Sequence, residues 1–208
     1  METESKINRL VNFVQGLPTF HIVTEYDGHY SHIGATIADA VLQANKRYET
    51  HVRPRIKRIR RIYPQAATMS GLRNLLAEKT TIRFLDWRGM DRVDRFDAIV
   101  DLFSAEEVET EDDLREWLMN ERNLVKLAKI KGVGPKTIDY FKILTGIQTC
   151  AIDRRLLDFL IRAEIEVASY DEAQKIINSA ADALGIQRAY FDHSIWEYMG
   201  QQGLQLCK

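Results

Sequence analysis

A pair of glycines between two helical patterns is the feature that most constrains how this chain folds. Apolar residues recur at helical spacing over 122–130, and a second helical pattern runs over 135–145. Between them stand Gly132 and Gly134, which permit backbone angles that a side chain would forbid. Pro135 suits the first position of a helix, where its missing N–H is not needed. The stretch therefore predicts two helices joined by a tight hairpin.

The residues after the hairpin carry chemistry. The start of a helix offers backbone N–H groups and a dipole that attract phosphate. Lys136 lies in the first turn of the second helix, where the dipole disfavours a positive charge, and an uncharged lysine amine is a usable nucleophile. Further on, Asp153 is predicted to cap the next helix. The helix carries the chain about 16 Å and the following segment spans at most about 20 Å, so the chain is long enough to bring Asp153 near Lys136.

Together these residues resemble the helix-hairpin-helix signature of the DNA glycosylase superfamily that includes endonuclease III. The family pattern is a Gly-hydrophobic-Gly hairpin, a lysine two positions on, and a hydrophobic-Asp pair that opens the next helix. The matching residues here are Gly132-Val133-Gly134, Lys136 and Ile152-Asp153. The resemblance implies an all-α fold of two helical lobes, with the active site in the cleft between them.

The rest of the chain agrees with an all-α fold, because no segment alternates convincingly as a strand would. Further helical patterns cover 3–15, 33–51, 53–62, 70–78, 91–103, 154–161, 171–184 and 188–200, with a short helix near the acidic run 106–116. The resemblance implies a central lobe over 29–148 that ends in the helix-hairpin-helix at 122–146, and a second lobe formed by 1–28 and 149–208.

The resemblance also implies a reaction. In the bifunctional enzymes, the lysine attacks the anomeric carbon of a flipped-out nucleotide, a Schiff base forms, and elimination cuts the strand. We therefore expect a base-excision DNA glycosylase with AP lyase activity, with Lys136 and Asp153 as the catalytic residues. Three alternatives stay open: a monofunctional glycosylase, a non-catalytic helix-hairpin-helix DNA-binding module, and a helical protein-interaction domain.

The expected partner is double-stranded DNA with a damaged base or an abasic site. Candidate DNA-binding residues are Lys131, Gly132, Val133 and Gly134 of the hairpin, Arg154 and Arg155 after the catalytic aspartate, and Gln43. In the resembled enzymes, a polar residue near the position of Gln43 fills the gap left by the extruded base. Lys131 replaces the usual proline, and Arg154-Arg155 replace a common Thr-His pair, so the damaged base stays undetermined. The basic run 53–61 fits either phosphate contact or a solvated helix face.

Composition limits the other possibilities. With 29 basic and 30 acidic residues, the chain has no global charge that favours nucleic acid, so DNA binding must depend on local patches. Two cysteines, Cys150 and Cys207, cannot hold a four-thiolate iron–sulfur cluster. We expect no metal and no cofactor, although the resemblance allows a monovalent cation at the hairpin. Without an apolar run long enough to span a membrane, a monomer in the cytoplasm, associated with the nucleoid, is expected.

Overall fold

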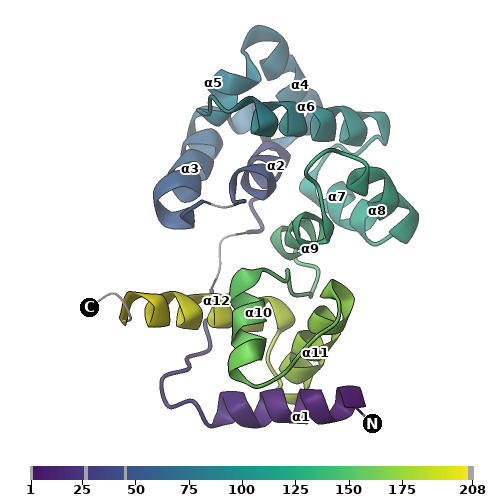
Figure 1. Ribbon diagram of the computed structural model, residues 1–208. Coiled ribbons are helices and arrows are strands. Elements are labelled where there is room, and N and C mark those ends of the chain that lie inside the picture. The colour runs from purple at the N-terminus through teal and green to yellow at the C-terminus, as the bar shows by residue number, and fades with distance from the viewer. Residues whose placement is uncertain (1, 26–27, 45, 206–208) are drawn as a thin grey trace. The chain divides into compact units, whose positions relative to one another are not determined.

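The computed structural model describes residues 2–25, 28–44 and 46–205 (Figure 1). This part of the chain contains twelve α-helices and no strand, which confirms the predicted all-α fold. The chain divides into two compact units. The larger unit is Gly28–Ile147, and the smaller unit combines Met1–Asp27 with Gln148–Lys208.

The larger unit is built around helix α2 (Ile33–Leu42), in which every residue is buried. A helix that is buried on all sides must be surrounded by other elements. Residues from α3, α4, α6, α7, α9 and η2 all contact α2. The surrounding elements are η1 (a π-helical turn, Tyr48–Val52), α3 (Arg53–Ile62), η2 (a 3₁₀ turn, Pro64–Ala67), α4 (Met69–Glu78), α5 (Thr81–Leu85), α6 (Met90–Ala105), α7 (Glu111–Leu118), α8 (Glu121–Ala128) and α9 (Pro135–Leu144).

Two buried polar side chains fix the start of α2. The Nδ1 atom of His32 accepts a hydrogen bond from the Ala35 amide at 3.1 Å, and its Nε2 atom donates to the Tyr63 carbonyl at 3.0 Å. The carboxylate of Glu111, from α7, accepts a hydrogen bond of 2.5 Å from the Thr36 hydroxyl. Burial lowers the pKa of His32, so the imidazole is neutral and can accept one hydrogen bond while donating another.

One predicted helix in this unit is wrong in length, and one helix was not predicted. The helix expected over 33–51 ends at Leu42, and η1 follows as a separate turn. The apolar pattern that places α2 in the core stops there, because the next residues are mostly polar and cannot continue a buried helix. Helix α5 was not expected. It begins at the N-cap Thr80, whose hydroxyl accepts from the Arg83 amide, and it is too short to show periodicity.

The smaller unit packs four helices around an aromatic core. Its helices are α1 (Glu2–Gln15), α10 (Arg154–Arg162), α11 (Tyr170–Ala183) and α12 (Arg188–Gln205). The ring of Phe159 lies 5.3 Å from that of Phe13 and 5.8 Å from that of Phe20, in the range of favourable aromatic pairs. In neither unit is any described helix sufficiently long and apolar to cross a membrane.

Candidate active site and hairpin

The glycine hairpin joins α8 to α9 as predicted. The turn closes with a hydrogen bond of 3.0 Å from the Val133 amide to the Ile130 carbonyl, and Val133 is buried. Gly132 has a φ of +83°, in the left-handed region that favours glycine. Gly134 is the N-cap of α9, and Pro135 is the first helical residue. The hairpin therefore holds the first turn of α9 at a fixed place beside the larger unit's core.

An arginine from another helix holds the hairpin in this shape. The Nε atom of Arg95, on α6, donates to the Lys131 carbonyl at 3.0 Å. A Cβ atom at Gly132 would lie 1.8 Å from Nη2 of Arg95. Gly132 is thus required by its backbone angle, and a side chain at this position would also displace the guanidinium group of Arg95.

Gly134 differs from Gly132 in both respects. Its φ of −117° is open to any residue, and a Cβ atom built there meets nothing within 4 Å. Neither the backbone nor the packing of the described residues demands glycine at this position. A bare backbone here leaves room for a ligand to approach the start of α9.

Lys136 is the second residue of α9 and is half-buried. The helix turns its apolar side, which includes Phe141, into the core. One turn after Lys136, the hydroxyl of Tyr140 donates to Oδ1 of Asp39 at 3.2 Å. The lysine therefore stands on a helix that is anchored both at its first turn, by the hairpin, and one turn later, by a buried carboxylate.

Sequence reasoning missed this buried carboxylate. Oδ2 of Asp39 accepts from the Tyr30 hydroxyl at 2.6 Å and from the Tyr48 hydroxyl at 2.9 Å. Burial and the charge of Asp39 raise the pKa of Tyr30, so the phenol keeps its proton and remains a donor. The sequence signal was present, because Asp39 is the one charged residue in an otherwise apolar helix. A buried charge needs such partners.

Asp153 caps α10, as predicted. Its Oδ1 accepts from the amides of Arg155 at 2.8 Å and Leu156 at 3.2 Å. The start of a helix also favours a negative charge. Asp153 belongs to the smaller unit and Lys136 to the larger one.

The two arginines after Asp153 have different surroundings. Arg154 is 93% exposed, and its nearest acidic partner is Asp158 at 3.8 Å. The guanidinium group of Arg155 instead lies 3.9 Å above the ring of Trp196 and donates to the Trp196 carbonyl at 3.1 Å. The ring of His193 also stacks on the ring of Trp196, with the ring centroids 5.9 Å apart. DNA contact by these arginines stays a prediction, and Arg154 is the more accessible of the two.

The remaining candidate residues from the sequence are Gln43 and the two cysteines. Gln43 is the C-cap of α2 and is partly exposed. Cys150 is buried, and its Sγ atom donates to the Arg188 carbonyl at 3.3 Å. Cys207 lies outside the described residues. Within the described ranges, no group of three His, Cys, Asp or Glu side chains is arranged to hold a metal ion.

The helical arrangement is that of a helical DNA glycosylase fold. The chain is similar to the crystal structure of the 8-oxoguanine DNA glycosylase of Thermotoga maritima, with a TM-score of 0.51 and 17% sequence identity. The similarity covers 94% of this chain and 87% of that chain. By sequence, the chain belongs to the family described as "Domain of unknown function (DUF8548)", whose model matches residues 6–200. No curated protein matches the sequence.

Proposed function

We propose that the protein is a DNA glycosylase with AP lyase activity, in which Lys136 is the nucleophile and Asp153 assists it. The observation that carries the proposal is the position of Lys136 in the first turn of α9, directly after a glycine hairpin, in a chain with a DNA glycosylase fold. The hairpin amides suit a phosphate of the DNA backbone. Gly134, which the fold does not require, supports a close approach of that backbone.

The proposed chemistry uses side chains alone. The Nζ atom of Lys136 forms a bond to C1′ of a flipped-out nucleotide while the C1′–base bond breaks, and the base leaves with the electron pair and takes up a proton. The nitrogen lone pair then forms a double bond to C1′ as the C1′–O4′ bond breaks and O4′ takes up a proton, which gives a protonated Schiff base. Removal of a C2′ proton expels the 3′ phosphate and cuts the strand. Asp153, an anion fixed by two backbone amides, would stabilise the positive charge that develops on the sugar.

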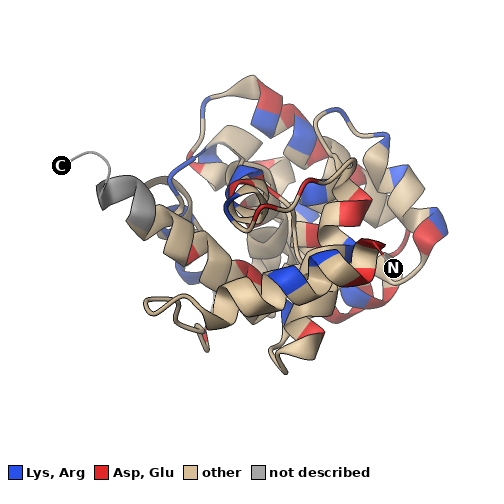
Figure 2. Cartoon of the chain, turned by 60° about the horizontal axis from the view of Figure 1, so that its bottom comes forward, with Lys and Arg blue, Asp and Glu red and all other residues tan. Residues whose placement is uncertain are grey.

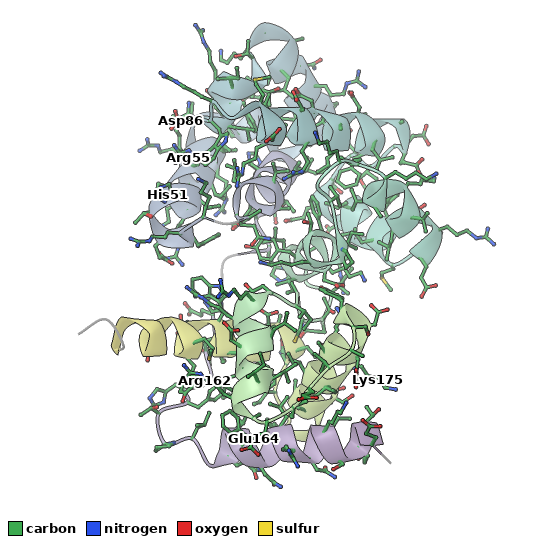
Figure 3. All side chains as sticks on the ribbon, in the orientation of Figure 1. His51, Arg55, Asp86, Arg162, Glu164 and Lys175 are labelled. Atoms are coloured by element: carbon green, nitrogen blue, oxygen red, sulfur yellow. The ribbon has the colours of Figure 1, made fainter. Side chains whose placement is uncertain are left out.

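The test is borohydride trapping on duplex DNA that carries an abasic site. Wild-type protein should form a covalent adduct, because borohydride reduces the Schiff base to a stable amine. Lys136→Ala should form none. The matched control is Lys175→Ala, which removes an exposed lysine from α11 (Figure 3) and should leave the adduct unchanged.

Trapping on the abasic duplex, together with base-release assays on duplexes that carry damaged bases, separates the alternatives. No adduct from folded protein that binds DNA would overturn the lyase activity. Release of a free base without an adduct would then identify a monofunctional glycosylase. If neither adduct nor base release appears, the protein is a DNA-binding module. Duplexes with several damaged bases should be compared, starting with 8-oxoguanine, because the similar structure is an 8-oxoguanine DNA glycosylase.

A further inference from the structure

Positively charged side chains continue from the hairpin along α6. Arg95 contacts the hairpin, and Arg92 lies one turn earlier on the same helix. Burial, followed by the nearby charge of Arg95, lowers the pKa of Arg92. Arg92 in turn lies over Trp87, with its Cζ atom 5.0 Å from the ring centroid. Two arginines one turn apart on α6 thus contact the hairpin and Trp87, respectively.

Three cations from different parts of the larger unit lie close to the ring of Trp87. Besides Arg92, the Cζ atom of Arg55 lies 5.2 Å from the ring and the Nζ atom of Lys46 lies 5.4 Å from it. Each contact is a favourable cation–π interaction. However, three like charges around one indole ring repel one another. An anion bound among them would relieve that repulsion.

Arg55 connects this group to helix α3. It donates to the carbonyls of His51 and Asp86, between which it lies in Figure 3. Acidic and basic residues are distributed over both units (Figure 2), yet α3 carries six cations and no acid in ten residues. Among the described residues, Glu49 pairs with Arg53 and Asp86 pairs with Arg55.

Three cations of α3 are exposed, and one of them, Arg60, lies over the ring of Tyr30. Ile56 and Ile59 face the core, which leaves Lys57 and Arg61 on the opposite side, one turn apart. Neither Lys57 nor Arg61 has a hydrogen bond or an ion pair to another described side chain. The whole chain has a formal net charge of −1, so α3 concentrates positive charge that the overall composition does not show.

We infer that the exposed cations of α3 form a track that binds the phosphate backbone of the duplex beyond the reacting nucleotide. The Trp87 group (Trp87 with Lys46, Arg55 and Arg92) adds positive charge beside this helix. That the bound polyanion is DNA rests on the proposed function. A helix of ten residues is about 15 Å long, a length over which one DNA strand presents roughly four phosphates. The track therefore adds backbone contacts that the hairpin alone cannot make.

The test measures how DNA affinity depends on salt. The parent is Lys136→Ala, so that no covalent chemistry contributes, and the probe is a fluorescent duplex with a stable abasic-site analogue. Each phosphate contact contributes roughly 0.9 to the slope of log affinity against log salt. Adding Lys57→Ala and Arg61→Ala should reduce that slope by about 2 and weaken binding roughly tenfold or more near 0.1 M salt.

Two controls accompany the double variant. Arg73→Ala with Arg115→Ala removes two exposed charges from α4 and α7 of the same unit and should leave the slope unchanged. Lys57→Arg with Arg61→Lys keeps both charges and should restore the parent slope. Thermal unfolding of each variant verifies that the unit remains folded.

The outcomes separate this inference from the proposed function. If Lys57→Ala with Arg61→Ala has the parent slope and affinity, the track is overturned, even when wild-type protein forms the covalent adduct. If no adduct forms but the double variant loses the expected slope, the track is supported and the proposed lyase chemistry fails. Equal losses in the double variant and the Arg73/Arg115 control would also overturn the track, because any lost charge would then have the same effect.

Discussion

Replacing Gly132 by alanine tests the explanation given for the hairpin. An L-residue with a φ of +83° pays a backbone penalty of roughly 1–2 kcal/mol. The new Cβ atom would also lie 1.8 Å from Nη2 of Arg95. Because the guanidinium is the end of a flexible side chain, it can move away, at the cost of its hydrogen bond to the Lys131 carbonyl. That bond is exposed to solvent, and its loss adds about 1 kcal/mol at most.

We therefore expect Gly132→Ala to destabilise the larger unit by about 2–3 kcal/mol, or by roughly 4–12 °C in melting temperature. Urea unfolding followed by tryptophan fluorescence measures this effect. A Trp196→Phe background removes the tryptophan of the smaller unit, so the signal comes from Trp87 and Trp117 in the larger unit. In an Arg95→Ala background, only the backbone penalty should remain.

Gly134→Ser is the matched control. Its φ is ordinary, no atom lies within 4 Å of the added Cβ, and serine is a favoured N-cap residue. Stability should stay within a few tenths of a kcal/mol of wild type, whereas affinity for the abasic duplex should fall because the side chain occupies the approach to the backbone. If Gly132→Ala and Gly134→Ser unfold at the same urea concentration, the assigned role of Gly132 is wrong.

Two further predictions concern Asp153 and His32. Asp153→Asn should keep the cap and most of the stability, while Asp153→Ala should lower the free energy of unfolding by about 1 kcal/mol. Both variants should slow base release by at least about tenfold in single-turnover assays. Equal rates for Asp153→Asn and wild type would reject a catalytic carboxylate. The pKa of His32 is lowered by burial, so the stability that its neutral form provides is present above a pH of about 6.5 and lost as pH falls toward its folded-state pKa. His32→Asn keeps a capping acceptor but does not titrate. The unfolding free energy of wild type should therefore exceed that of His32→Asn by less at about pH 5 than at about pH 7.5, as measured by urea titration. A difference that stays constant with pH would contradict the role of His32.

Local signals explain what the sequence allowed us to predict. The start of α9 depends on neighbours in sequence, since Pro135 and the two glycines act within a few residues, and Asp153 caps amides two and three positions away. The end of α2 was missed because the helix pattern was extended through polar residues that only burial excludes. Patterns over short windows therefore located the hairpin and its flanking helices well, but not the point where tertiary packing stops a helix.

Contacts between distant residues were beyond such reasoning. Arg95 and Lys131 are 36 positions apart, and Tyr140 and Asp39 are 101 positions apart. No periodicity or spacing links the members of either pair, because their proximity results from how α6, α9 and α2 pack. The sequence could have marked Asp39 as unusual in an apolar helix, but it could not have identified the tyrosines that hydrogen-bond to it.

The residues of the candidate site differ in whether the fold accounts for them. Gly132 is required by its backbone angle, and the cap explains Asp153, although asparagine or serine would cap equally well. Gly134 has no such explanation, since nothing in the described structure demands a glycine there, and the dipole of α9 disfavours the positive charge of Lys136. Positions where a residue conflicts with its local structure are where function is expected. Variants of Gly134 and Lys136 should therefore separate activity from stability most cleanly, whereas variants of Gly132 should change both.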